Sequence, residues 1–286
     1  MISIFAKRAF LNTNPYNDFI SKEKSYKGHG HLQRVSSMIR ADQIATEIGA
    51  TLNPTDGYKD DVCIYVKPHI KKGEDFTFEG RKAYLDIIDG HNLGQLLLKY
   101  PEVGLIVCSK ADYDTMSQVV PHKIVLIPQH HCNFERLKRT RTEVKRIGVV
   151  GTQSAFSFLP IGLTQELEAR GMELVLFSKF FDRKDIVDFY TRIDLQIVWR
   201  PYKKLLSNPL KIVNAASFGI PTIALEEKAF EEMGSAYMSV KTFDELISFV
   251  DAMRNKPDFY KMYADECLLS AEKYHISNIG KLYLNL

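Results

Sequence analysis

The chain has 286 residues, 45% of them apolar and 26% charged, and its formal net charge is +3. This composition is typical of a globular protein rather than a disordered or fibrous one, and the length allows two small domains. The small net charge gives no argument for nucleic acid as a partner. We also expect a cytoplasmic protein with free thiols, because its cysteines form no CxxC pair and no apolar run approaches the length of a membrane span.

Short apolar runs recur along the whole chain. They lie at 2–5, 62–66, 83–88, 105–108 and 124–127, and then at 147–150, 174–177, 195–198 and 222–225. Most are continuous in hydrophobicity, as in parallel strands that are covered on both faces. Helical patterns lie between the runs, for example one that closes at Gly49 and one that closes at Gly171. This alternation predicts an α/β fold with parallel sheets.

One segment interrupts the alternation. Residues 134–146 read FERLKRTRTEVKR, with many basic and few apolar residues. We interpret this segment as the connection between two Rossmann-like domains, at 1–143 and 144–286, that face a central cleft. Open parallel sheets bind ligands at the carboxyl ends of their strands, so such a cleft would hold the functional site.

The same basic segment has other interpretations. Its charges, from Arg136 to Arg146, would suit anionic lipid headgroups in peripheral membrane contact, but we favour a solvated connection. A nucleic-acid surface is disfavoured, because no aromatic residue interleaves with these charges beyond Phe134.

Residues 208–224 read NPLKIVNAASFGIPTIA and describe a sharp corner. A helix ends at Gly219, and a strand begins after Pro221. Together with RIGVVGT at 146–152 and DIVDFYTRIDLQIVW at 185–199, this segment resembles the donor domain of the GT-B class of nucleotide-sugar-dependent glycosyltransferases. The resemblance lies mainly in the second half of the chain.

This resemblance implies a function. The enzyme would move a sugar from a nucleotide-sugar donor, held by the C-terminal domain, to a hydroxyl of a glycan or glycoconjugate, held by the N-terminal domain. It would need no metal and no other cofactor, because cationic side chains and helix N-termini would stabilise the leaving diphosphate. It also implies that the last residues, 274–286, cross back onto the N-terminal domain.

The residues expected at the donor site are Thr152, Ser154, Arg200, Lys211, Asn214 and Glu232. Arg200 follows the strand at 195–198 and Lys211 lies in the first turn of the next helix, so both fall at strand ends. Arg200 has an alternative role, in which it pairs with a helix carboxylate or stacks on Trp199. Thr152 and Ser154 follow a glycine turn where backbone amides can approach phosphate. Glu232 would face the donor sugar or ribose, with its neighbour Glu231 as a competitor.

The chain departs from the family at a pair of glutamates. Many retaining members carry the spacing E-x7-E, and Leu206 and Asn214 stand at those positions here. Asn214 can hydrogen-bond a ribose hydroxyl but cannot act as a carboxylate. This leaves an inverting mechanism open, in which a base of the N-terminal domain deprotonates the acceptor. The candidates for this base are Asp89 and His91, followed by His29 and His31.

Two patterns suggest metal ligands, and we interpret neither as a metal site. Asp112 and Asp114 match a DxD pattern, but such short matches are frequent by chance and aspartates favour helix starts. The run HHC at 130–132 places soft ligands side by side, where they cannot easily converge on one tetrahedral ion.

Two other functions stay open at this point. One is a sugar-nucleotide epimerase or hydrolase of the same architecture, which would consume the donor without an acceptor. The other is a non-catalytic nucleotide- or glycan-binding module, which the missing glutamate pair would suit.

Overall fold

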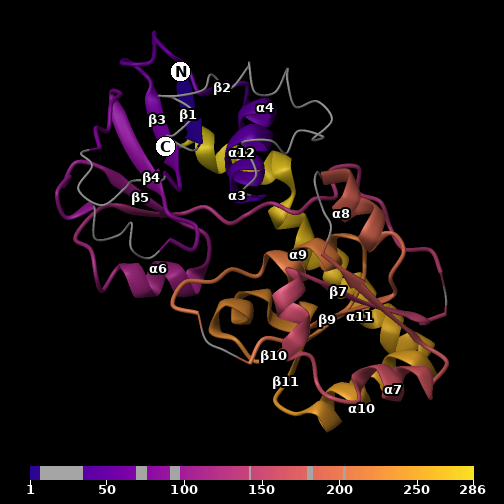
Figure 1. The fold of residues 1–286 in the computed structure, drawn as a ribbon. Coiled ribbons are helices and arrows are strands. Elements are labelled where there is room, and N and C mark those ends of the chain that lie inside the picture. Colours follow the sequence, from indigo (N-terminus) through magenta and orange to yellow (C-terminus); the bar gives the residue numbers. More distant parts are fainter. Residues whose placement is uncertain (7–34, 69–75, 91–96, 142, 179–182, 202–203) are drawn as a thin grey trace. The chain divides into compact units, whose positions relative to one another are not determined.

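A computed structural model describes residues 1–6, 35–68, 76–90, 97–141, 143–178, 183–201 and 204–286 (Figure 1). The chain divides into two compact units. Unit 1 comprises Met1–Gln129, Leu205–Asn208 and Ile276–Leu286, and unit 2 comprises His130–Lys204 and Pro209–His275. The division between the units therefore lies at 129/130, whereas the sequence placed it at 143/144, and a short segment and the end of the chain return to unit 1.

Unit 1 is built on a parallel sheet with the strand order β2-β1-β3-β4-β5-β6. The strands are β1 (Ile2–Ala6), β2 (Thr51–Leu52), β3 (Val62–Val66), β4 (Lys82–Asp86), β5 (Gly104–Val107) and β6 (Ile124–Leu126). Every residue of β3 and β5 is buried, which explains why these strands read as unbroken apolar runs.

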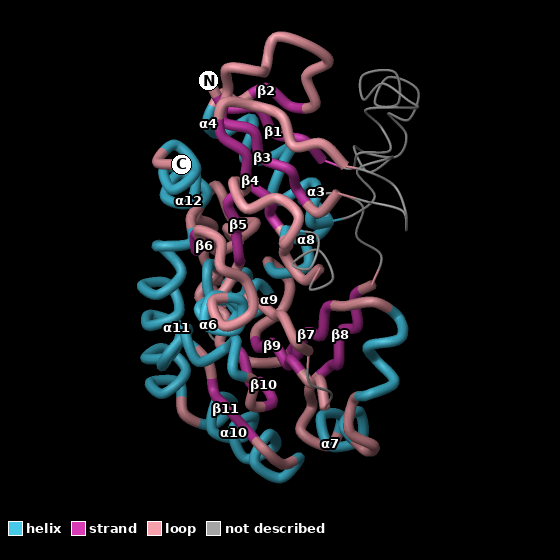
Figure 2. Tube along the Cα trace, turned by 90° about the vertical axis from the view of Figure 1, so that its left-hand side faces the viewer, coloured by secondary structure: helices cyan, strands magenta, loops and turns pink. Residues whose placement is uncertain are grey.

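The helices of unit 1 are mostly short. They are α3 (Val35–Ser37), the π-helix η2 (Met38–Gln43), α4 (Ile44–Ile48), α6 (Lys110–Met116) and α12 (Ile276–Leu284). Helix α4 ends at Gly49, which adopts φ 67°, a left-handed conformation that favours glycine. Helix α12 packs beside α4, where a Cβ at Gly280 would meet Ile48 at 2.9 Å (Figures 1 and 2).

A buried arginine ties the end of the chain into unit 1. Arg40 is fully buried, and its Nε donates to Asp86 Oδ2 at 2.7 Å. Its Nη1 donates to the carbonyl oxygens of Ile127 and Pro128, and its guanidinium lies 5.4 Å from the centre of the Tyr283 ring. The terminal segment, which the resemblance placed on the N-terminal half, thus lies in unit 1.

Unit 2 contains a second parallel sheet, with the order β11-β10-β9-β7-β8. Its strands are β7 (Arg146–Val150), β8 (Glu173–Phe177), β9 (Leu195–Val198), β10 (Thr222–Leu225) and β11 (Met238–Val240). Its helices are η3 (Gln153–Phe158), α7 (Leu163–Glu168), α8 (Arg183–Tyr190), α9 (Leu210–Ser217), η4 (Lys228–Ala236), α10 (Phe243–Asn255), α11 (Pro257–Ala271) and η5 (Glu272–Tyr274), of which η3, η4 and η5 are 3-10 helices.

The predicted parallel α/β architecture is confirmed, because every predicted apolar run contains a strand of one of the two sheets. The predicted corner is also present. Helix α9 ends just before Gly219, which adopts φ 69°, and β10 begins directly after Pro221. The two-residue strand β2 and the edge strand β11 have no counterpart among these runs.

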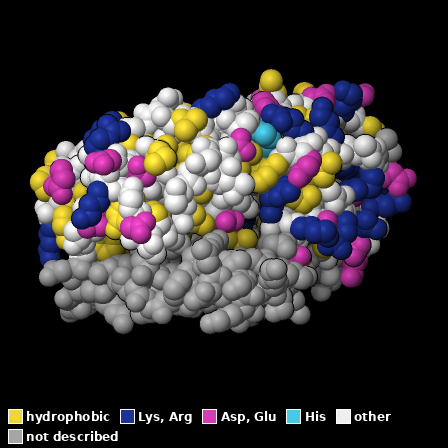
Figure 3. All heavy atoms as spheres, turned by 90° about the horizontal axis from the view of Figure 1, so that it is seen from above, with side chains coloured by type: hydrophobic (Ala, Val, Ile, Leu, Met, Phe, Trp, Pro, Cys, Tyr) yellow, Lys and Arg dark blue, Asp and Glu magenta, His cyan; other side chains and the backbone are white. Residues whose placement is uncertain are grey.

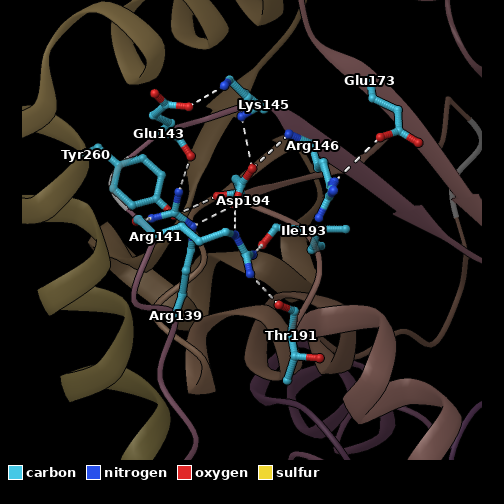
Figure 4. Close-up of polar contacts among 10 residues, drawn as sticks. All are labelled: Arg139, Arg141, Glu143, Lys145, Arg146, Glu173, Thr191, Ile193, Asp194 and Tyr260. Atoms are coloured by element: carbon cyan, nitrogen blue, oxygen red, sulfur yellow. Dashed lines mark hydrogen bonds and ion pairs between the residues drawn. The ribbon is translucent and has the colours of Figure 1, made fainter.

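The basic segment is bound to unit 2 through Asp194 (Figure 4). Arg139 Nε and Arg141 Nε donate to Asp194 Oδ1 at 2.9 and 2.8 Å, and the amides of Lys145 and Arg146 donate to Oδ2. Burial alone would raise the pKa of Asp194, but these amides and guanidinium groups outweigh it and hold the pKa below its usual range. The segment is therefore attached to the sheet at the amino ends of β7 and β9.

Acidic side chains accompany the basic ones in the described part of the chain. On the face shown in Figure 3, acidic side chains lie among the Lys and Arg side chains. Within the basic segment, Arg136 donates two hydrogen bonds to Glu272, and Glu135 forms an ion pair with Arg183. No helix in the described part of the chain is long and apolar enough to cross a membrane.

Candidate functional site

The strand order of unit 2 indicates a candidate ligand-binding position at the carboxyl ends of β7 and β9. From β7 the chain moves outward to β8 on one side, and then crosses to β9 on the other side. Open parallel sheets bind their ligands at such a reversal of strand order. The loops that follow β7, β9 and β10 carry Gly151, Arg200 and Glu227, and helix α9 begins after the second of these loops.

Lys211 points its ammonium group at this position. It lies in the first turn of α9, and its Nζ would be 3.4 Å from a Cβ built on Gly151. Among the described residues, no carboxylate or carbonyl accepts a hydrogen bond from this Nζ. Burial, followed by the nearby charges of Arg200 and Lys204, lowers the pKa of Lys211 to about 8, against the opposing charge of Glu227.

A buried polar network fixes the backbone of Lys211. Its carbonyl oxygen accepts a hydrogen bond from Gln196 Nε2 at 3.0 Å and lies 3.3 Å from the hydroxyl of Tyr190. The same Nε2 donates to Thr222 Oγ1, and Gln196 Oε1 accepts from Tyr190 at 2.8 Å. Because all three network side chains are buried, the start of α9 is held at a defined position.

Arg200 pairs with Glu227 across the ends of two neighbouring strands. Its Nε donates to Glu227 Oε2 at 3.1 Å, and its Nη2 contacts Oε1, so that the ion pair has two points of contact. The side chains are only 19% and 17% exposed. The guanidinium carbon also lies 6.0 Å from the ring centre of Phe230. Arg200 thus pairs with a carboxylate, as its alternative role predicted, but this carboxylate lies in the loop that precedes η4 and not on a helix.

The other expected donor residues differ in their surroundings. Thr152 and Ser154 directly follow Gly151, and their hydroxyl oxygens are 3.1 Å apart. Asn214 also lies on α9, but its Oδ1 accepts a hydrogen bond from the amide of Cys132 at 2.8 Å and so anchors a loop. Glu232 Oε1 accepts from the Tyr274 hydroxyl at 3.4 Å. The structure thus brings Thr152, Ser154, Arg200 and Lys211 to one edge of the sheet, whereas Asn214 and Glu232 contact other parts of unit 2.

In unit 1, one of the four candidate bases can be described. Asp89 follows β4 and forms an ion pair with Lys67, which follows β3. Ile88, beside Asp89, adopts φ 55°, a strained value for a β-branched residue, and such strain clusters at functional positions. His29, His31 and His91 lie outside the described residues.

The DxD aspartates have structural roles within unit 1. Asp112 Oδ1 accepts a hydrogen bond from the amide of Ser207 at 2.9 Å, and Ser109 Oγ donates to the carbonyl of Ser207 at 2.7 Å. Leu206 is 2% exposed in the core of unit 1. Asp114 pairs with Lys110 within helix α6. These contacts agree with the assignment of Leu205–Asn208 to unit 1.

The HHC run belongs to a buried loop of unit 2. His131 Nδ1 accepts a hydrogen bond from the amide of Asn133 at 3.2 Å. Burial, and then the neighbouring His275 and His130, lower the pKa of His131 to about 3, so that it is neutral at pH 7. In the described part of the chain, no group of three or more His, Cys, Asp or Glu side chains could hold a metal ion.

Comparison with known proteins gives matches among solved structures alone. No family model and no curated protein matches the sequence. Anabaena Alr3699/HepE in complex with UDP is similar over 100% of this chain and 99% of its own, with 12% identity and a TM-score of 0.57. Sucrose-phosphate synthase from Thermosynechococcus elongatus is similar over 92% of this chain and 79% of its own, with 11% identity and a TM-score of 0.55.

TarM is a third similar structure, with 13% identity, a TM-score of 0.54 and coverage of 80% of this chain. This chain spans about half the length of that relative, 55% of it. At such low identities the similarity concerns the fold. The chain has the fold of the GT-B glycosyltransferases, with two Rossmann-like units, as the resemblance implied.

Proposed function

We propose that this chain is a glycosyltransferase that binds the diphosphate of a nucleotide-sugar donor at the carboxyl edge of the unit 2 sheet. The observation that carries the proposal is the position of the Lys211 ammonium, next to Gly151 and at the reversal of strand order. The UDP complex of the similar HepE structure supports a nucleoside diphosphate as the ligand class.

The geometry suits the chemistry of a leaving diphosphate. When the bond between the sugar and the diphosphate breaks, negative charge develops on a phosphate oxygen. A cation that is already in place and shielded from water stabilises this charge strongly, because no reorganisation is needed during the reaction. Lys211 supplies such a cation, and Arg200 supplies a second one with a planar set of donors. The hydroxyls of Thr152 and Ser154 add further donors beside Gly151.

The acceptor would be activated from unit 1. A base removes the proton from the acceptor hydroxyl, the oxygen attacks the anomeric carbon, and the nucleoside diphosphate leaves. Asp89 is our candidate for this base among the described residues. Leu206 and Asn214 stand at the E-x7-E positions, so the chain has no glutamate pair there and an inverting displacement stays open.

The two cations also support binding without a metal ion. We expect that one nucleoside diphosphate among UDP, GDP, CDP, ADP and dTDP raises the unfolding temperature equally in EDTA and in magnesium. A ligand at 100 times its dissociation constant adds about 2.7 kcal/mol to the free energy of unfolding. The Lys211→Met variant should lose this effect, and Lys138→Met, which changes an exposed lysine of the same unit, should keep it. The proposal fails if no nucleotide stabilises the wild-type chain.

Product analysis then separates the related activities. With a sugar conjugate of the bound nucleotide, a transferase consumes the donor only when a glycan or glycoconjugate acceptor is present. Consumption without an acceptor would identify an epimerase or hydrolase, and binding without consumption would identify a non-catalytic module.

A further inference from the structure

We propose that Glu227 is a positioning residue of the diphosphate site: it orients the guanidinium of Arg200 and balances the positive charge of Arg200 and Lys211. This role rests on the proposed function, because it concerns the same site. Glu227 itself would not contact the reacting atoms.

The fold brings Glu227 and Arg200 together. Strands β9 and β10 are neighbours in register, with Ile197 opposite Ile223. Arg200 follows the end of β9 and Glu227 follows the end of β10, so that both side chains emerge at the same edge. The two-point contact fixes the plane of the guanidinium group, which a single contact would leave free to rotate. Phe230, buried in the following helix η4, lies near the guanidinium as a further support.

The charges around Lys211 give Glu227 a second effect. The charged groups that act on Lys211 are Arg200 and Lys204, from the loop after β9, and Glu227, from the loop after β10. Two of these three groups are cations, which favour loss of the Lys211 proton. Glu227 acts in the opposite direction and therefore helps to keep Lys211 charged at neutral pH.

A purely structural ion pair would behave differently in one measurable respect. Loss of such a pair lowers stability, but it leaves the pH dependence of anion binding unchanged. Loss of a charge that acts on Lys211 shifts this pH dependence. The neighbouring Glu226 offers a matched control, because it lies on the same turn and pairs instead with Lys241 at 3.4 Å, with its side chain 58% exposed.

The experiment measures the dissociation constants of UDP and of inorganic pyrophosphate by calorimetry between pH 6 and pH 9.5. In the wild-type chain we expect the affinity to fall on the alkaline side with a midpoint that follows Lys211. In Glu227→Gln the midpoint should be lower by about 1 on the pH scale. The variants Glu226→Gln and Glu227→Asp both keep the negative charge at position 227. In these variants the pH midpoint of the affinity should match the wild-type value.

Arg200→Lys examines the same pair from its other side. This variant keeps the positive charge but loses the planar two-point contact, so we expect UDP affinity to fall about tenfold while the midpoint stays at the wild-type value. An unchanged midpoint in folded Glu227→Gln would overturn the role of Glu227 and leave the proposed function standing. A wild-type chain that binds neither UDP, another nucleoside diphosphate nor pyrophosphate would overturn both.

Discussion

Replacing Lys211 with methionine should make the chain more stable at neutral pH while it removes nucleotide binding. The pKa of Lys211 is lowered from 10.5 to about 8, chiefly by burial. One unit of pKa corresponds to about 1.4 kcal/mol, so keeping the ammonium charged inside unit 2 costs about 3 kcal/mol of folding free energy. Methionine has a similar length and no charge, and it adapts well to irregular space.

The sign of the effect depends on pH. Because the folded-state pKa lies below the unfolded-state pKa, the cost is fully present below pH 8. It disappears as the pH rises toward 10.5, where the unfolded chain also releases this proton. The difference in unfolding free energy between variant and wild type should therefore be greatest at pH 7, and it should decrease as the pH rises from about 8 to 10.5.

The assay is unfolding in urea, which is monitored by the fluorescence of tryptophan. The single tryptophan, Trp199, belongs to unit 2 and directly precedes Arg200, so its signal reports on the unit that contains Lys211. We expect Lys211→Met to raise the free energy of unfolding by up to about 3 kcal/mol at pH 7. The control Lys138→Met should stay within about 0.5 kcal/mol of the wild type.

Two results would refute this reasoning. A Lys211→Met variant that is less stable than the wild type at pH 7 would show that the ammonium makes favourable contacts in the folded chain. A stability gain that is the same at pH 7 and pH 10 would show that it does not come from the buried charge. The other buried titrating groups are common to both chains and cancel in the comparison.

Three further substitutions examine other parts of the structure. Asp194→Asn should lower the free energy of unfolding in urea by about 3 kcal/mol at pH 7, because it leaves the buried guanidinium of Arg139 without its carboxylate. Since the folded-state pKa of Asp194 is depressed, the wild type should lose this advantage as the pH falls below about 4, and a constant difference down to pH 2 would contradict the assignment. Asp112→Ala should destabilise unit 1 by about 1–3 kcal/mol in the same assay, because it removes the buried acceptor of the Ser207 amide, whereas Asp114→Ala, at an exposed pair, should change little. Gly151→Ala should lower UDP affinity about tenfold by calorimetry with a small change in unfolding temperature, because the added methyl group would lie 3.4 Å from Lys211 Nζ; unchanged affinity would place the diphosphate elsewhere.

Those parts of the fold that rest on local patterns could be predicted from the sequence. A strand buried on both faces must be apolar throughout, and a helix that ends at a left-handed residue favours glycine, as at Gly219. Arg200 and Lys211 could also be identified from local patterns. Arg200 follows a recognisable strand, and Lys211 lies in the first turn of the next helix. These features need no knowledge of distant contacts.

The roles that depend on distant partners could not be predicted. Asn214 accepts its hydrogen bond from Cys132, which lies 82 residues earlier in the chain, and nothing in the local sequence indicates this contact. Glu227 lies in the polar run EEK, which is typical of a solvated turn. Its contact with Arg200 can be recognised only when β10 is known to pair with β9. The sequence alone does not show that the ends of β9 and β10 are adjacent.

Leu206 departs from the family pattern, and the structure gives a reason for the leucine at this position. From the sequence, Leu206 marks only the absence of a glutamate. In the structure, its side chain is buried in the core of unit 1, and the adjacent Ser207 is held by Asp112 and Ser109. The apolar residue is required there because this segment leaves unit 2 after Arg200 and returns before Lys211. The identity of Leu206 is therefore explained by the core of unit 1, to which this segment belongs, and not by the chemistry of a donor site in unit 2.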